Sequence, residues 1–189
     1  MEISEGRWKE EQRWIERCCA GDTAPFRLLV ERYERMVRSV IYRLVGSMQD
    51  VEEIAQETFV TAFENLMLYA AESRFSTWLC QIALNKSRDA LRARRRRDEA
   101  VDIDGIELPS DADGPEDVFE QRQRSAQLQR VLSQLKDRDR EVIVLKYLSG
   151  LSYEEIARIH GCSEEAAKVR GHRARVELKR VLQHLGIKP

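Results

Sequence analysis

The sequence has 189 residues, enough for one helical domain or two small ones, and either arrangement can bury a core. Charged residues make up 34% of the chain and aromatic residues 7%, a composition typical of a highly solvated helical protein. The four cysteines form no C-x-x-C pair, which argues against a disulfide framework or a zinc site. No apolar run approaches the roughly 18–20 residues of a membrane span and no signal peptide is visible, so we expect a cytoplasmic protein without membrane insertion.

The net charge of −1 hides two opposite charge blocks that adjoin along the chain. Residues 86–97 carry seven basic side chains and one acid, a charge of +6. Residues 98–118 carry nine acids and no base, a charge of −9. Only the basic block suggests a polyanion as a partner.

Three stretches with apolar residues at helical spacing predict the first helices. The first runs over residues 5 to about 20, with Trp8, Ile15 and Cys19 on one side. The second runs from a cap at Asp22 or Thr23 to Gly46, and the third begins near Asp50. The inward residues of the third are Val51, Ile54, Ala55, Thr58, Phe59, Ala62, Phe63 and Leu66.

A fourth helix, predicted over residues 75–97, combines an apolar stripe with a polar face. Ser76 is its expected N-cap, and Trp78 and Leu79 belong to the apolar stripe. The other face carries amides and cations at i, i+4, i+7 and i+11: Gln81, Asn85, Arg88 and Arg92. Aromatic residues gather just before this face, so the stretch suits melted nucleic acid, with bases stacked on rings and phosphates on guanidinium groups. An ordinary solvated helix with core aromatics explains the same pattern.

The glycines, prolines and acids of residues 98–115 interrupt the helical periodicity, which predicts a linker. It divides the chain into a domain over 1–97 and a second over 116–189, both all-α. In the second domain Asp137 is a predicted cap, and Val142, Ile143, Leu145 and Leu148 follow it at core positions.

A helix-turn-helix is predicted near the C-terminus of the second domain. Ser152 and Glu155 form a capping box, Gly161 ends the short helix that follows, and Ser163 caps a long helix to about Leu185. The inward stripe of the long helix is predicted from its spacing: Ala167, Gly171, Ala174, Leu178, Val181, Leu182 and Leu185. Its outward face is basic, as expected of a recognition helix, whereas a generic αα-hairpin is the alternative.

Both halves together resemble the bacterial RNA polymerase sigma factors of the extracytoplasmic-function group, in the sigma-70 family. The resemblance covers about residues 22–97 and 128–182, in the order of that family. Its most specific segments are EEIAQETF and FSTWL…IALN, and a second match is REVIVLKYLSGLSYEEIARIHGCS. The resemblance implies two helical domains, no cofactor and no catalytic residue. It implies three kinds of partner: core polymerase (the β′ clamp helices and the β flap), promoter DNA at the −10 and −35 elements, and an anti-sigma factor.

The resemblance also implies which residues bind. Polymerase docking falls on Glu53, Gln56 and Glu57. Contact with the −10 element falls on Tyr69, Arg74, Asn85, Arg88 and Arg92, and residues 69–74 match the loop that captures a flipped base. Contact with the −35 element falls on Lys168, Val169, His172, Arg173 and Arg175.

The chain departs from the family pattern in the long C-terminal helix. Glu165-Ala166-Ala167 stands where Gly-Thr-Val is usual, and Gly171 stands where an apolar residue is usual. A glycine inside a helix costs roughly 1 kcal/mol relative to alanine, so this helix is expected to be loosened. Val169 replaces a small polar residue, which changes the expected base preference at −35.

Two other functions fit parts of the sequence. A stand-alone helix-turn-helix regulator would bind duplex DNA without polymerase, usually as a dimer, and no dedicated dimer seam is visible. A nucleic-acid enzyme would need acids beside His or Cys at metal-ligand spacing, or a glycine loop for phosphates, and the sequence shows neither. We therefore expect a non-enzymatic sigma factor.

Overall fold

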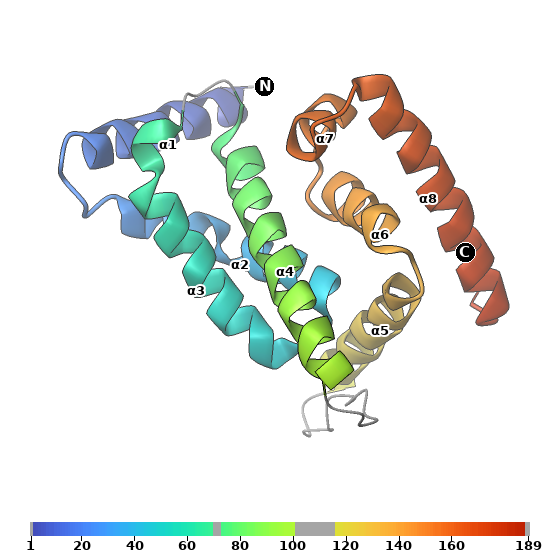
Figure 1. Ribbon diagram of the computed structural model, residues 1–189. Helices are drawn as coiled ribbons and strands as arrows, with labels where there is room; N and C mark the ends of the chain where they lie inside the picture. Colours follow the sequence, from blue (N-terminus) through green and yellow to red (C-terminus); the bar gives the residue numbers. More distant parts are fainter. Residues whose placement is uncertain (1, 70–72, 101–115, 188–189) are drawn as a thin grey trace. The chain divides into compact units, whose positions relative to one another are not determined.

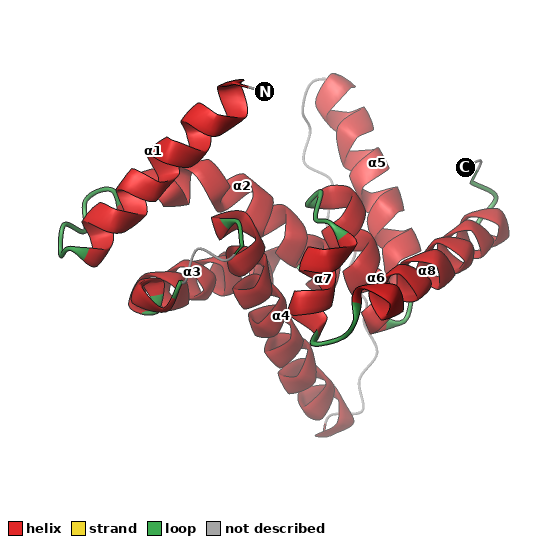
Figure 2. Cartoon of the chain, turned by 90° about the horizontal axis from the view of Figure 1, so that it is seen from above, coloured by secondary structure: helices red, strands yellow, loops and turns green. Residues whose placement is uncertain are grey.

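The computed structural model describes residues 2–69, 73–100 and 116–187. In these residues every regular element is helical, which confirms the all-α class (Figures 1 and 2). The chain forms two compact units, residues 1–87 and 88–189, so their boundary lies inside helix α4. The predicted linker lies outside the described residues except for its first three, 98–100, which continue α4.

The first unit contains α1 (Glu2–Cys19), α2 (Phe26–Val45), α3 (Met48–Glu64), the short 3-10 turn η1 (Leu66–Leu68) and the beginning of α4 (Phe75–Ala100). A tight connection joins α2 to α3. Gly46 adopts a left-handed conformation (φ 76°) and donates its N–H to the carbonyl of Tyr42, which ends α2. Ser47 then accepts a 3.3 Å hydrogen bond from the N–H of Asp50 and starts α3. This connection packs α2 directly against α3.

The start of α4 differs from the prediction. The helix begins at Phe75, and the carbonyl of Arg74 accepts the N–H groups of Thr77 and Trp78 at 2.9 and 3.2 Å. Ser76 is therefore inside the first turn and is not the N-cap. The helix therefore begins two residues earlier than a cap at Ser76 requires, and the fully buried side chain of Phe75 lies in its first turn.

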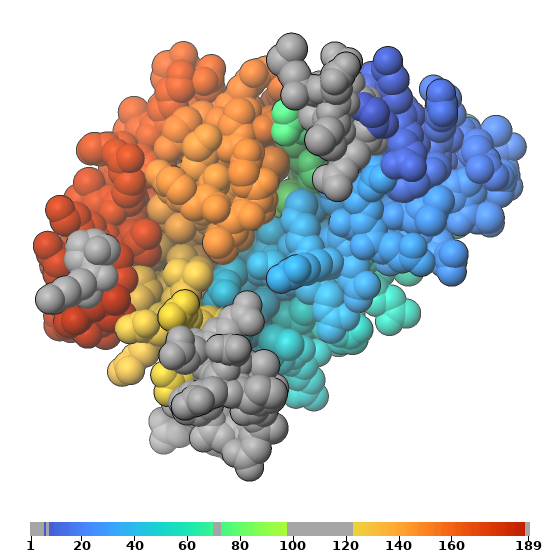
Figure 3. All heavy atoms as spheres, turned by 180° about the vertical axis from the view of Figure 1, so that it is seen from behind, coloured from blue at the N-terminus to red at the C-terminus, as the bar shows by residue number. Residues whose placement is uncertain are grey.

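Helix α1 packs on α2, and Figure 3 shows their surfaces next to each other. Ile15 is buried as predicted, but Trp8 is 52% exposed and Cys19 is exposed. The buried polar residue of this face is Glu11, whose carboxylate accepts a hydrogen bond from the Tyr33 hydroxyl. The contact between α1 and α2 is therefore partly polar. The apolar pattern of the sequence predicted the buried face of α1 incorrectly because that pattern did not include Glu11.

The second unit contains the rest of α4, α5 (Glu116–Ser133), α6 (Asp137–Ile143), a π-helical turn η2 (Val144–Leu148), α7 (Tyr153–His160) and α8 (Glu164–His184). Asp137 is the first residue of α6, and Lys136 holds the N-cap position without a side-chain cap, so the predicted cap at Asp137 is wrong by one residue. Val142, Ile143 and Leu145 are buried, whereas Leu148 is 43% exposed because the π turn ends the helical repeat there.

The helix-turn-helix has the predicted capping. The N–H of Glu155 donates to the Ser152 hydroxyl at 3.1 Å, and the N–H of Ser152 donates to the Glu155 carboxylate at 2.7 Å. Gly161 is left-handed (φ 62°), and Ser163 accepts from the N–H of Ala166 at 3.2 Å. Helices α7 and α8 pack against each other through this turn.

The inner face of α8 is lined by small residues. Ala167, Gly171 and Ala174 are buried, as predicted, and the other residues of that stripe are half-buried. A Cβ added to Gly171 would lie 2.5 Å from Cε1 and 2.6 Å from Oη of Tyr153. The ring of Tyr153, from α7, therefore occupies the space that a larger residue at position 171 would fill.

Candidate functional site

Helix α3 presents an exposed polar stripe. Glu53, Gln56 and Glu57 are all exposed, and their i, i+3, i+4 spacing places them on one face, as the sequence predicted. Glu57 also forms a 3.2 Å ion pair with Lys86 of α4. Glu53 and Gln56 therefore form the part of the stripe farther from that ion pair.

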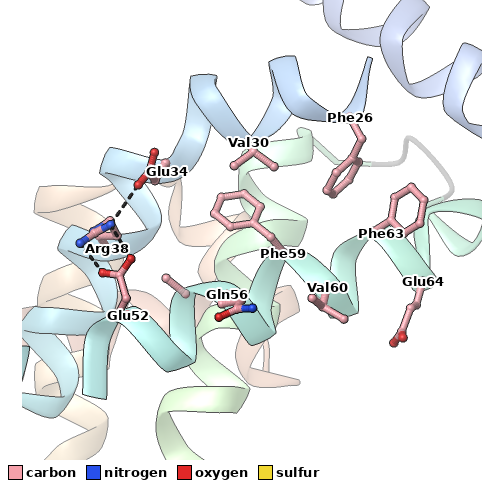
Figure 4. A pocket seen from close by; sticks show the side chains of 11 residues that line it. Phe26, Val30, Glu34, Arg38, Glu52, Gln56, Phe59, Val60, Phe63 and Glu64 are labelled. Carbon is pink, nitrogen blue, oxygen red and sulfur yellow. Dashed lines mark hydrogen bonds and ion pairs between the residues drawn. The ribbon is translucent and has the colours of Figure 1, made fainter. Parts of the chain in front are cut away.

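Next to this stripe lies a hollow of about 560 Å³ between α2 and α3 (Figure 4). Its apolar part consists of Phe26, Val30, Phe59, Val60 and Phe63. The rings of Phe26 and Phe63 meet edge to face with centroids 5.0 Å apart. Val60 is 49% and Phe63 41% exposed, so the predicted burial of Phe63 is wrong. Its ring packs sideways on Phe26 and leaves one side open.

The other end of the hollow is charged. Arg38 of α2 pairs with Glu34 at 3.0 Å and with Glu52 at 3.1 Å, and Gln56 lies beside this group (Figure 4). This hollow was not predicted from the sequence. The residue that could have indicated it is Val60, an apolar residue on the predicted polar side of the helix, one position after the core residue Phe59.

An aromatic cluster precedes the polar face of α4, as predicted. The ring of Tyr69 lies 5.5 Å from that of Phe75 and 5.4 Å from that of Trp78, between centroids. The Tyr69 hydroxyl donates a 2.6 Å hydrogen bond to the carbonyl of Ser73. Phe75 is buried, whereas Tyr69 and Trp78 are half-buried and keep part of their rings open. Residues 70–72 of the predicted base-capturing loop lie outside the described residues.

The polar residues predicted for −10 contact fall into two groups. Arg74 and Asn85 are exposed in the first unit, near the aromatic cluster in sequence. Arg88 and Arg92 belong to the second unit by its bounds. Arg88 donates two hydrogen bonds of 2.7 Å to the carboxylate of Glu141, and this partner raises its pKa. Arg92 is exposed and pairs with Asp89 at 3.3 Å. A DNA contact by Arg88 therefore requires its pair with Glu141 to open.

The outer face of α8 carries the residues predicted for −35 contact. Lys168, Val169, His172, Arg173 and Arg175 are all exposed. Val169, His172 and Arg173 lie on the side opposite the buried Ala167, Gly171 and Ala174, whereas Lys168 and Arg175 lie on the flanks. Lys168 forms a 2.8 Å ion pair with Glu164 one turn earlier, and this partner raises its pKa. An exposed i, i+4 pair of this kind is weak, so Lys168 can exchange Glu164 for a phosphate at little cost.

Over residues 2–69, 73–100 and 116–187, no helix is long and apolar enough to span a bilayer. Within the same described residues no group of three His, Cys, Asp or Glu side chains is placed to hold a metal ion.

Comparison with known proteins matches both units. Residues 29–97 match Sigma-70 region 2, and residues 125–178 match Sigma-70, region 4. The chain is 35% identical over 183 residues to the ECF RNA polymerase sigma-E factor of Escherichia coli (strain K12), an alignment that covers 93% of this chain and 95% of that protein. This chain belongs to the extracytoplasmic-function sigma factors. It is also 31% identical to the RNA polymerase sigma-H factor of Pseudomonas aeruginosa, over 94% of the chain and 96% of that protein.

Solved structures agree with this membership. CnrH, in complex with the cytosolic domain of CnrY, has a TM-score of 0.72 at 26% identity and covers 93% of this sigma factor and 98% of that chain. The sigma factor RpoE of Bartonella quintana, in complex with the anti-sigma factor NepR, has a TM-score of 0.68 at 25% identity, covering 84% of this chain and 96% of that one. The chain is therefore an RNA polymerase sigma factor that directs transcription initiation, and a stand-alone helix-turn-helix regulator would not explain the region 2 match. Sigma factors bind core polymerase and promoter DNA as non-catalytic initiation factors.

Proposed function

We propose that this sigma factor docks on the β′ clamp helices of core polymerase through the polar stripe of α3 and the hollow beside it. The observation that carries the proposal is that Gln56 belongs both to the exposed polar stripe, with Glu53, and to the lining of the hollow, whose apolar part includes the exposed Val60 and Phe63. A polar stripe beside an open aromatic floor has the anatomy of a protein interface, in which apolar anchors are rimmed by charges. We also propose that the second unit contacts the β flap, and that the protein acts in the cytoplasm with its polymerase.

A co-purification assay with core polymerase tests the docking site. Glu53→Lys combined with Gln56→Ala should weaken association, and Phe63→Ala should weaken it further by removing an exposed anchor. Glu16→Lys reverses the charge of an exposed acid on α1 and is the matched control, which should bind as wild type does. Unchanged co-purification of the α3 variants, with Glu16→Lys alike, would show that polymerase docks elsewhere.

We propose that promoter reading divides between the two units. Tyr69 offers a partly open ring to an unstacked base, and base stacking of this kind is worth roughly 1–3 kcal/mol. Asn85, exposed farther along α4, carries an amide that can donate to and accept from base edges. Arg173 lies on the outer face of α8, where a recognition helix meets the major groove. The −10 element is therefore read as a melted strand and the −35 element as a duplex.

Two DNA probes separate these roles, with a promoter first selected from random duplexes by the holoenzyme. One probe is the −35 duplex alone, and the other carries a single-stranded −10 segment and no −35 element. Asn85→Ala and Tyr69→Ala should lose affinity only for the single-stranded probe, and Arg173→Ala only for the duplex. If both classes of variant lose affinity equally on both probes, the division is wrong.

We propose, finally, that an anti-sigma factor restrains this protein. The support is that the RpoE of Bartonella quintana, a solved relative of similar fold, is in complex with the anti-sigma factor NepR. A restraining partner should compete with core polymerase in the co-purification assay. Co-purification with both at once on the same chain would contradict that restraint.

A further inference from the structure

The outer face of α8 carries two large apolar side chains among its cations. Val169 is 60% exposed and Val176 is 56% exposed, two turns apart on the same side of the helix. Val169 lies between Lys168 and Arg173, in the N-terminal half of the helix. In a helix-turn-helix the N-terminal residues of the second helix contact base edges. Val169 is therefore placed where a base edge is read, and Val176 lies two turns farther on.

The side chain of Val169 can complement only one feature of the major groove. The edges of guanine, cytosine and adenine present hydrogen-bond donors and acceptors there, whereas thymine adds a C5-methyl group. An isopropyl group placed against a polar edge would remove water from a donor or acceptor without replacing the hydrogen bond, which is costly. Placed against a methyl group, it removes apolar surface from water on both sides.

We propose that Val169 is a specificity-determining residue that selects thymine in the −35 duplex by contact with its C5-methyl group. This inference rests on the proposed reading of the −35 element by α8. Valine suits the task because a β-branched side chain in a helix is held almost entirely in one χ1 rotamer, so its methyl groups are already positioned. The flanking Lys168 and Arg173 can meet phosphates and polar edges on either side of it.

The test replaces thymine by deoxyuridine, which removes the methyl group and leaves every hydrogen-bonding group in place. Full-length protein with core polymerase first selects duplexes from a pool randomised upstream of a fixed −10 segment. Each thymine of the selected −35 element is then changed singly to deoxyuridine. At one position wild type should lose about fourfold in affinity, the factor that corresponds to ~0.8 kcal/mol for one buried methyl-sized group.

Two variants identify the side chain responsible. Val169→Ala should reduce the penalty for deoxyuridine at that position to less than about twofold, because the methyl contact is gone. Val176→Ala removes the same atoms from an equally exposed valine and should keep the fourfold penalty. Both positions are exposed, so both variants should fold, which circular dichroism checks.

The possible results distinguish a failure of this inference from a failure of the proposed reading of the −35 element by α8. If no upstream sequence is enriched, α8 does not read a −35 element, and both ideas fail. If a sequence is enriched but lacks thymine, or no deoxyuridine weakens binding, or Val169→Ala keeps the full penalty, the −35 reading stands and the role of Val169 is overturned.

Discussion

Replacing Gly171 by alanine tests whether Tyr153 holds the two helices of the helix-turn-helix together. From helix propensity alone, the change should stabilise α8 by roughly 1 kcal/mol. The added Cβ, however, would lie 2.5 Å from Cε1 of Tyr153, far inside van der Waals contact, so the ring has to move. The atoms that meet the new Cβ are the tip of a half-buried tyrosine ring, which can swing aside, so the cost falls near the lower end of the roughly 1–3 kcal/mol typical of overpacking. This cost offsets the roughly 1 kcal/mol gained in helix propensity, and we expect the stability of Gly171→Ala to be close to that of wild type.

A double-mutant cycle gives the sign of the coupling. In a Tyr153→Ala background the three atoms nearest to the new Cβ are gone, so Gly171→Ala should stabilise the protein there by roughly 1 kcal/mol. The cycle should therefore yield a coupling of about 1 kcal/mol, the overpacking cost that the tyrosine ring alone causes.

The assay has to follow the second unit separately. All three tryptophans, Trp8, Trp14 and Trp78, lie in the first unit, so their fluorescence in urea reports that unit and should not change. Amide hydrogen exchange of α7 and α8 peptides in the full chain gives the free energy of opening of the helix-turn-helix. If Gly171→Ala slows exchange by the same factor with and without the tyrosine ring, the packing argument is refuted.

Two further predictions concern buried titratable groups. Burial lowers the pKa of His160 to about 4; the nearby Glu141 carboxylate opposes this shift, whereas the positive charges of Arg88, Arg138 and Arg170 add to it. Because an unfolded histidine titrates near 6.5, the unfolded chain binds more protons, and stability should fall by on the order of 3 kcal/mol as pH drops from about 6.5 through 4. Neither ring nitrogen of His160 makes a hydrogen bond, so leucine can replace the ring without leaving a hydrogen-bond partner unsatisfied. His160→Leu should therefore remove this pH dependence of stability, measured by urea unfolding followed by circular dichroism. An unchanged pH profile would contradict the prediction. Burial likewise raises the pKa of Glu11, while Tyr33 and Arg32 oppose that shift. The folded chain then holds its proton to higher pH than the unfolded chain, so stability falls as pH rises above the ordinary glutamate range near 4.3. The free energy of unfolding of Glu11→Gln, relative to wild type, should therefore increase as pH rises from 4 to 7, measured by urea unfolding followed by tryptophan fluorescence. A difference that stays constant with pH would count against this prediction.

The helices could be predicted from the sequence because local rules and packing agree over most of them. Three such features are the capping box at Ser152, the left-handed Gly161 and the cap at Ser163. Each of them depends on residues only a few positions apart in the sequence. The exposed face of α8 could be predicted from its apolar stripe, because at 3.6 residues per turn the positions of the buried residues determine which residues lie on the other side. These predictions were confirmed.

The misplaced features depend on contacts between segments distant in sequence. Glu11 is buried because Tyr33 and Arg32 of α2 satisfy it, and no local pattern contains that pairing. The hollow beside Phe63 exists because Phe26, thirty-seven positions earlier, packs against one side of its ring. The ring of Tyr153 fills the space above Gly171, and the sequence by itself showed only the missing side chain.

The small residues on the inner face of α8 also divide that helix into two halves. Its buried residues end at Ala174, so residues 168–173 are interleaved with buried positions, while residues 175–184 have no buried side chain. Reading a base edge depends on distances held to fractions of an ångström, and Val169, the residue proposed for that task, lies in the packed half. Coulomb attraction to a phosphate changes little over an ångström, so Arg175 and Lys179 in the exposed half do not depend on such close placement. We therefore expect substitutions that loosen the packing of Ala167 or Ala174 to weaken base reading more than phosphate attraction.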